Sequence, residues 1–465
     1  MQKYTELLGT APLGRLLIKL SLPGMAATIS TSLYNIVNTI WVTRIGYRAI
    51  AALTIVMPFQ ILSYAIGGGT GIGIAALVSR RFGEKNPDAA NHAAGQIFFI
   101  STIWGLLFIL IAVLFADEIL PILGSRPDIL DYSKQYLVIT AFGSPQMIFS
   151  IVTASLIRGS GDAVKPMIIM ISSTVLNIIL DPLLIFGIGP LPEMGVAGAA
   201  LGTVISQTFG ALLSLYYFLT GKTAYHIRLA HIRPDISILK DIYRVGAPTM
   251  ISQLMESLVF LLFNKVVSSF GSLVIATIGI VMRISDFAFM PVMGVSNGML
   301  PIVGYNFGAR DYKRLWHTVK LASIGIMVFL AIITILMVVF APQIVSIFSQ
   351  DPALATEAVP VMRIMLSTML FVGPTMMFIT AFQGLSKGTL ALFLSLLRQF
   401  LIFIPLLFIF RYLFGLYGVW WSMPASDILS FTLTLVFILR EYRKEGKTMA
   451  GIAVVTSATN GNKRD

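Results

Sequence analysis

The sequence contains no cysteine, only four histidines and few charged residues. Without cysteine, the chain cannot form disulfides, thiolate metal sites or a cysteine nucleophile. Charged residues make up 12% of the chain, about half the share usual in soluble proteins, whereas hydrophobic residues make up 56%. With a mean hydropathy of +0.86, a soluble core cannot enclose this much apolar surface. We therefore expect an all-α membrane protein whose main solvent is the lipid bilayer.

Long apolar runs predict twelve transmembrane helices, because about 20 helical residues span a bilayer core of about 30 Å. A polar stretch, residues 220–246, separates two groups of six such runs. The predicted spans are residues 16–43, 51–79, 95–116, 134–157, 166–188, 195–219, 247–270, 274–305, 318–341, 357–382, 390–410 and 416–439.

The net charge of +12 is explained by an uneven distribution of Lys and Arg among the loops. The odd-numbered loops contain only Arg44, Arg48, Arg126, Lys134 and Arg411, whereas the even-numbered loops and both termini contain most of the others. Cytoplasmic loops are rich in Lys and Arg, so both termini are expected in the cytoplasm and the protein in the cell inner (cytoplasmic) membrane. Nucleic-acid binding is unnecessary to explain the charge, and a monomer is expected.

The two groups of spans are related by an internal repeat with a constant separation of 225 residues. A unit of six spans returns the chain to its starting side, so the halves have the same orientation and are related by an axis along the membrane normal. The expected domains are residues 1–219, a cytoplasmic connecting loop 220–246, residues 247–440, and a disordered cytoplasmic tail 441–465. The matched positions are Pro23 and Pro248, Gly46 and Gly271, Ala51 and Ala276, Phe82-Gly83 and Phe307-Gly308, and Gly159 and Gly384.

Asp181 is the clearest functional candidate in the first half, because ionisable side chains within spans are costly. Asn177 lies four residues earlier and therefore on the same helix face, and Pro182 leaves a backbone carbonyl without its usual partner. No basic residue lies inside a span of this half. A carboxylate among amides suits a site that binds H⁺ or Na⁺, although a structural aspartate is the alternative. Further polar side chains in these spans are Tyr34, Asn35, Asn38, Thr203 and Gln207.

The second half combines acids with bases inside its predicted spans. Glu256 has no local counter-ion, whereas Arg283 and Asp286 have the spacing of an intrahelical ion pair. Arg398 and Asp427 form a second possible pair between spans 11 and 12. Together with the polar residues of the first half, Gln253 and Arg283 are expected to line a substrate cleft.

Two backbone features concern helix shape rather than chemistry. Pro23 and Pro248, at equivalent positions, permit kinks and are candidate hinges, although passive bends are equally common in membrane helices. The glycine-rich run at residues 67–73 matches no phosphate-binding pattern and lies inside a span, which favours close helix packing.

Several motifs resemble the multidrug and toxic compound extrusion (MATE) family, and the likeness covers about residues 10–440. The resemblance is greatest to the prokaryotic DinF-like and MepA-like members. It implies two six-helix lobes around a central cleft, and extrusion of organic, mostly cationic compounds in exchange for H⁺ or Na⁺, without enzymatic activity or a cofactor. The motifs are Leu20-Ser21-Leu22-Pro23, Tyr34-Asn35-Ile36-Val37-Asn38, Arg80-Arg81-Phe82-Gly83, Ile157-Arg158-Gly159-Ser160-Gly161-Asp162, the stretch from Asn177 to Pro182, and Gly195-Val196-Ala197-Gly198-Ala199-Ala200.

The resemblance also implies roles for individual residues. Asp181 matches the first-lobe acid that DinF-like members use for cation coupling, and Asn177 matches its neighbour; a sodium-coupled protein would bind Na⁺ at Asp181. Asn38 stands where many of these proteins have aspartate, so a two-acid proton site cannot be assumed. Glu256 matches the span-7 acid of the NorM-like branch, whose span-10 aspartate has no counterpart in residues 371–384.

Three other functions are weaker fits to the sequence. A lipid-linked saccharide flippase would require several convergent Lys and Arg residues in the cleft to bind pyrophosphate, and the first half has none within its spans. A membrane-embedded enzyme would require a cluster of catalytic or metal-binding side chains, which the spans do not contain. A channel would not explain the repeat and the paired prolines as well.

Overall fold

The structure is a computed structural model that describes residues 2–189, 192–348 and 351–461. The side chains of residues 2–4, 35, 36, 229, 272 and 445–461 lie outside this description. The described residues fold almost entirely into helices, joined by short turns, and contain no strand.

The first half comprises nine helices. They are α1 (Gln2–Thr10), α2 (Leu13–Ile45), α3 (Tyr47–Gly83), α4 (Pro87–Leu114), α5 (Ala116–Ile122), α6 (Leu130–Phe142), α7 (Ser144–Gly159), α8 (Val164–Phe186) and α9 (Gly195–Leu219). A short 3₁₀ helix, η1 (Leu229–Ile232), lies in the connection to the second half.

The second half repeats this pattern and ends in the longest helix. Its elements are α10 (Ile236–Ser268), α11 (Ser272–Gly308), α12 (Tyr312–Val339), α13 (Ala341–Phe348), α14 (Pro352–Leu366), α15 (Met369–Gly384), α16 (Gly388–Leu396), the π-helical segment η2 (Leu397–Ile402) and α17 (Phe403–Gly461).

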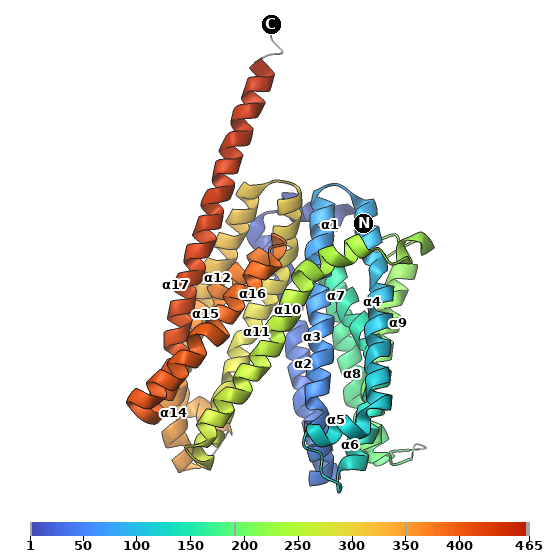
Figure 1. Cartoon of the computed structure of the whole chain (residues 1–465), viewed down its shortest axis with the longest axis vertical. Coiled ribbons are helices and arrows are strands. Elements are labelled where there is room, and N and C mark those ends of the chain that lie inside the picture. Colours follow the sequence, from blue (N-terminus) through green and yellow to red (C-terminus); the bar gives the residue numbers. More distant parts are fainter. Residues whose placement is uncertain (1, 190–191, 349–350, 462–465) are drawn as a thin grey trace.

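Twelve membrane crossings follow from these helices. Nine described helical stretches are long and apolar enough to span a bilayer, and two bent pairs, α6 with α7 and α14 with α15, each form one further span. The ninth stretch, Gly388–Lys444, contains two crossings, because non-helical torsions at Gly415 break α17 and the chain turns back (Figure 1). The fold expected from the sequence, two six-helix lobes, is confirmed. The bends of 47° and 43° were not predicted.

The repeat extends to helix bounds and to individual backbone torsions. The starts and ends of α3 and α4 differ by 225 residues from those of α11 and α12. Gly46 and Gly271 have φ values of 126° and 116°, with the same ψ of 169°. Positive φ also recurs at Lys85 and Arg310, and at Gly161 and Ser386. The two halves therefore share turn geometry as well as helix length.

The connection between the halves is shorter than the loop predicted for residues 220–246. Helix α10 begins at Ile236 because Asp235 caps it, accepting hydrogen bonds from the backbone N–H groups of Ser237 and Ile238 at 2.8 and 3.3 Å. Charged residues at the start of α10 suggested a loop, but they belong to a helix that extends beyond the apolar part. Likewise, α17 continues to Gly461, although the sequence predicts a disordered tail from residue 441.

The lobes meet through α2 and α3 of the first half and α10 and α11 of the second. Glycines allow this approach: a Cβ at Gly73 would lie 2.2 Å from the Ile242 carbonyl oxygen, and one at Gly294 would lie 2.2 Å from Cγ of Met25. The packing role predicted for the glycine-rich run of α3 is thereby supported. Figure 1 shows the lobes diverging from the end that holds the N-terminus towards the opposite end.

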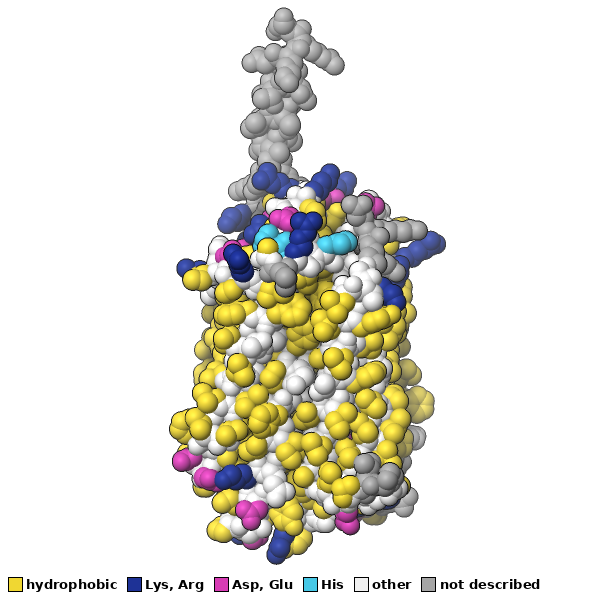
Figure 2. Space-filling model, turned by 90° about the vertical axis from the view of Figure 1, so that its right-hand side faces the viewer, with side chains coloured by type: hydrophobic (Ala, Val, Ile, Leu, Met, Phe, Trp, Pro, Cys, Tyr) yellow, Lys and Arg dark blue, Asp and Glu magenta, His cyan; other side chains and the backbone are white. Residues whose placement is uncertain are grey.

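We call the end with the N-terminus the basic end and the opposite end the far end. Figure 2 shows hydrophobic side chains covering the flank of the first lobe, with most Lys and Arg side chains gathered at the basic end. Towards the far end, large side chains on α3, α10 and α11 remain open to solvent: Tyr64, Phe260 and Phe287 are 50%, 48% and 45% exposed. The lobes are thus packed together at the basic end and open at the far end.

Candidate functional site

Asp181 lies on α8 in the first lobe, where it is only 1% exposed. Asn177, one helical turn earlier, donates a hydrogen bond from Nδ2 to Asp181 Oδ1 at 3.0 Å, as their spacing predicted. The second carboxylate oxygen, Oδ2, has no hydrogen-bond partner, and neither does Oδ1 of Asn177. None of the ion pairs of the described residues involves Asp181. The site therefore offers oxygen ligands without a fixed cation.

Gly202 on α9 allows this helix to pack directly against the carboxylate. A Cβ at Gly202 would lie 2.5 Å from Asp181 Oδ1 and 3.5 Å from Asn177 Nδ2. One turn earlier on α9, a Cβ at Gly198 would lie 2.4 Å from the Leu184 carbonyl oxygen of α8. Backbone contact between α8 and α9 thus encloses Asp181 on this side, so any ion must reach it from elsewhere.

A polar cavity of about 120 Å³ lies in the same lobe between α2, α3, α6, α7 and α9. Asn38 Nδ2 lies 3.4 Å from the Tyr34 hydroxyl, and Oδ1 of Asn38 is buried without a partner. Of the residues predicted for the site, the cavity is lined by Tyr34, Asn38, Thr203 and Gln207. The side chain of Asn35 lies outside the described residues.

Sequence reasoning missed the contributions of α3 and α6 to this cavity. Gln60 donates a hydrogen bond to the Tyr136 hydroxyl at 3.3 Å, and Ser63, Tyr64 and Thr140 line the same space. Polar residues inside apolar spans were the available signal, and it was applied to the first, fifth and sixth spans only.

A second polar cavity, of about 280 Å³, lies in the second lobe. Arg398 Nε and Asp427 Oδ1 form the predicted ion pair at 3.1 Å, and Thr368 donates a hydrogen bond to Asp427 Oδ2 at 3.2 Å. Arg398 lies in η2, where the π-helical turn shifts the hydrogen-bonding pattern, and Ser426 donates to the Arg398 carbonyl oxygen at 2.9 Å. Glu256 lines this cavity, so the structure places it in the other lobe from Asp181.

The predicted ion pair between Arg283 and Asp286 does not form. Both side chains are exposed, and the ion pairs of the described residues contain none between them. Spacing of three residues permits contact on a helix, but here Asp286 lines the cavity of the second lobe. Arg283 lies three turns before Gly294 on nearly the same face of α11, the face that packs on α2. It therefore faces the space between the lobes.

Gln253 lies at the point where the lobes begin to separate. A Cβ at Gly68 of α3 would be 3.3 Å from its Nε2 atom, so the side chain crosses between α10 and the first lobe. Pro23 and Pro248 lie inside α2 and α10, both of which continue as helices through the proline. The hinge role of these prolines stays a prediction.

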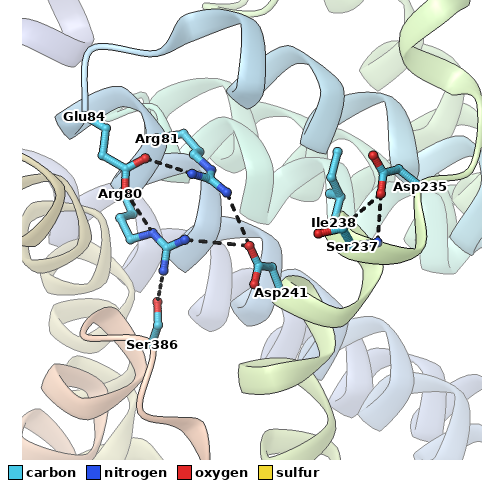
Figure 3. A network of polar contacts seen from close by, with 8 residues as sticks. All are labelled: Arg80, Arg81, Glu84, Asp235, Ser237, Ile238, Asp241 and Ser386. Carbon is cyan, nitrogen blue, oxygen red and sulfur yellow. Dashed lines mark hydrogen bonds and ion pairs between the residues drawn. The ribbon is translucent and has the colours of Figure 1, made fainter.

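Charged side chains join the lobes at the basic end, and we call this group the latch (Figure 3). Asp241 on α10 contacts two arginines of α3: its Oδ2 lies 3.7 Å from Nη2 of Arg80 and 3.3 Å from Nη2 of Arg81. Both arginines also contact Glu84, at 3.3 and 3.0 Å. Arg80 further donates to the Ser386 hydroxyl at 3.3 Å. The latch therefore connects α3 with two segments of the second lobe.

A group of potential metal ligands also occurs at the basic end, formed by Asp88, His92 and His231. The Arg228 backbone N–H donates to Nδ1 of His231 at 3.2 Å, so the proton of the neutral ring resides on Nε2, which faces Asp88 at 3.7 Å. A protonated Nε2 cannot ligate a metal ion. The geometry instead suits a contact that fixes the connecting segment to α4.

Comparison with known proteins reveals similarity over nearly the whole chain. The chain is 28% identical to the multidrug export protein MepA of Staphylococcus saprophyticus over 424 residues, covering 90% of this chain and 93% of that protein. It is also 28% identical to MepA of Staphylococcus aureus, covering 93% and 95%.

Solved structures share the fold. The crystal structure of MATE in the straight conformation matches with a TM-score of 0.90 at 25% identity, covering 96% of this chain and 99% of that one. The outward-facing conformation of a multidrug resistance MATE family transporter matches with a TM-score of 0.87, also at 25% identity and with the same coverage.

The MatE family model matches the chain twice, at residues 23–183 and 248–409. These two matches begin 225 residues apart and coincide with the internal repeat. Together they cover well over half of the chain. The protein therefore belongs to the MatE family of membrane transporters, the multidrug and toxic compound extrusion (MATE) family.

Proposed function

We propose that this protein is a multidrug efflux antiporter that exports organic, mostly cationic compounds in exchange for H⁺ or Na⁺. The observation that carries the proposal is Asp181, which is buried in a lipid-embedded lobe with one carboxylate oxygen unpartnered and no cation paired to it. Such a carboxylate is costly unless a proton or an alkali ion binds to it. The likeness to proteins named multidrug export protein supports the efflux part.

The orientation follows from charge. The basic end is assigned to the cytoplasm, in accordance with the distribution of Lys and Arg, so both termini lie there and the far end faces outside. Because the lobes are packed at the basic end and open at the far end, the structure corresponds to an outward-facing state. Its similarity to an outward-facing MATE family transporter supports this assignment.

In the proposed cycle, H⁺ or Na⁺ enters the first lobe from outside and neutralises Asp181. Neutralisation removes the attraction of the carboxylate for a cationic compound in the space between the lobes, and the compound leaves. The latch then opens, the lobes close at the far end, and the ion is released to the cytoplasm. One monovalent ion crossing 100 mV supplies about 2.3 kcal/mol, enough to bias an exchange between two states.

Glu256 provides a second candidate site in the other lobe. It lines a cavity that also contains Asp286 and the Arg398–Asp427 pair. The arginine nearby favours the ionised form of Glu256 and so disfavours proton uptake. We therefore assign coupling to Asp181, and a contribution to the binding of cationic compounds to Glu256.

The test is dye efflux from proteoliposomes in which pH and Na⁺ gradients are imposed separately. Asp181→Asn retains the shape of the side chain and should abolish efflux driven by either gradient, whereas Glu256→Gln should weaken export of cationic dyes but retain coupling. Normal gradient-driven efflux by Asp181→Asn would disprove the assignment. If neither gradient drives dye movement but labelled lipid-linked saccharides cross the bilayer, the protein is a flippase instead.

A further inference from the structure

A groove of about 710 Å³ lies on the outer side of the second lobe, between α12 and α17 at the basic end. Both helices pack against α15 and have little contact with each other, so Phe378 of α15 forms the floor of the groove. On the α17 side the wall is apolar, formed by Leu435, Ile438 and Leu439. The groove is thus separate from both polar cavities and from the space between the lobes.

One edge of this groove is positively charged. Lys313, His317 and Lys320 lie four and three residues apart, so they share one face of α12, and all three are exposed. None of them takes part in an ion pair or hydrogen bond given for the described residues. Lys320 lies about 10 Å deeper along the helix than Lys313. The charges therefore begin at the membrane surface and continue into the groove.

Nearby acids do not compensate this charge. Asp311 caps α12, where its carboxylate accepts the backbone N–H of Arg314 at 3.0 Å. Glu441 lies next to Tyr442 of the groove, but it is paired with Lys387. The groove consequently combines an uncompensated cationic edge with an apolar interior.

Two buried polar atoms in the same groove have no partner. Trp316 is 7% exposed and Ser323 is 6% exposed, yet Nε1 of Trp316 and Oγ of Ser323 make no hydrogen bond. Hydroxyls in these spans commonly donate to the carbonyl four residues earlier, as Thr318 does to Arg314 at 2.8 Å. Both orphan groups lie on the wall of the groove. An unsatisfied buried donor costs roughly 1–3 kcal/mol, which indicates that a ligand satisfies them.

We propose that this groove binds an anionic phospholipid, with its phosphate at Lys313 and Lys320, an oxygen of the phosphate or glycerol ester at Trp316, and an acyl chain along Phe378 and Leu435. Charge complementarity selects the headgroup, because basic pockets between transmembrane helices at the cytoplasmic side suit anionic lipids. Tryptophan at this depth commonly has its ring in the apolar region and its N–H towards polar groups. Trp316 is also held by an edge-on contact with Tyr442, at 5.7 Å between ring centroids.

The proposal is tested by native mass spectrometry of the full chain in neutral detergent, exposed to equal amounts of phosphatidylglycerol and phosphatidylcholine. We expect the wild type to retain phosphatidylglycerol preferentially. The double variant Lys313→Gln/Lys320→Gln should lose this preference by roughly 25-fold, at about fivefold for each lysine. The variant Trp316→Phe retains the aromatic ring and lacks the donor, and it should bind phosphatidylglycerol roughly tenfold more weakly.

The matched control is Lys85→Gln/Lys240→Gln, which removes two exposed lysines from the basic end outside the groove and should retain wild-type preference. Equal loss in both double variants would mean that the net charge, rather than this groove, attracts the lipid, and would overturn the proposal. Equal retention of the two phospholipids by the wild type would also overturn it, since the groove would then bind acyl chains or apolar compounds without headgroup selection. Thermal unfolding of every variant in the same detergent verifies that the fold is intact.

Discussion

Adding one methyl group beside Asp181, in the variant Gly202→Ala, tests whether the position of the carboxylate controls transport. The new Cβ would lie 2.5 Å from Asp181 Oδ1, whereas ordinary contact begins at 3.4 Å, so the oxygen must retreat by about 0.9 Å. That oxygen accepts the 3.0 Å hydrogen bond from Asn177, which such a displacement breaks or weakens. Crowding of this kind costs roughly 1–3 kcal/mol of stability.

The matched control is Gly210→Ala, two turns further along α9. Its Cβ would lie at the same distance of 2.5 Å, but from the hydroxyl of Ser173 instead of a carboxylate. Both variants crowd the contact between α8 and α9, and they should lower the melting temperature in detergent to a similar extent. Only Gly202→Ala changes the site itself.

The assay is initial dye efflux from proteoliposomes at several imposed ion gradients. We expect Gly202→Ala to lower the rate at least tenfold, because displacing a binding group by about 1 Å can cost up to about 100-fold. A higher outside concentration of the coupling ion should partly restore the rate, while Gly210→Ala should transport at nearly the wild-type rate. The reasoning is refuted if Gly202→Ala transports normally, or if both variants lose transport in proportion to their loss of stability.

Three further predictions concern the latch and the second lobe. Arg81→Gln removes two contacts of the latch, so a single cysteine introduced at the buried Ala76, in this otherwise cysteine-free chain, should react roughly two- to fivefold faster with a water-soluble maleimide; an unchanged rate would mean that the latch does not hold the lobes. Asp427→Asn leaves the charge of Arg398 without its partner and should destabilise the protein by about 3 kcal/mol, measured as the melting temperature in detergent; replacing both partners by apolar residues should cost less, and a larger cost would contradict this account. Gly271→Ala forces a side chain into a φ of 116° and should cost about 1–3 kcal/mol in the same measurement, so an unaltered melting temperature would contradict the strain.

The features predicted correctly from the sequence are those that depend on local helix geometry. The length of apolar runs gave the number of spans, and spacing of four residues placed Asn177 beside Asp181. The constant offset of 225 gave the two lobes. These inferences need only the rise and period of a helix and the thickness of a bilayer.

The features missed depend on which helices meet and how they bend. No sequence pattern indicated that Gly202 touches Asp181, because the contact is set by the packing of α8 on α9. The bend between α6 and α7 falls at Gly143, where a long apolar run had concealed the break. The spacing of Arg283 and Asp286 allowed a pair, but side chains open to a water-filled space gain little by pairing. Such outcomes are tertiary and require the assembled structure.

The π-helical segment η2 has a consequence for how the two halves diverged. The second match to the family model, residues 248–409, contains one residue more than the first, residues 23–183, and a single inserted residue is what a π-turn accommodates within a helix. One added residue rotates all subsequent side chains by about 100°. After a gene duplication, such an insertion exposes different residues to the old site in one step. It thereby frees one copy to acquire the Arg398 pair while the other keeps its lone acid.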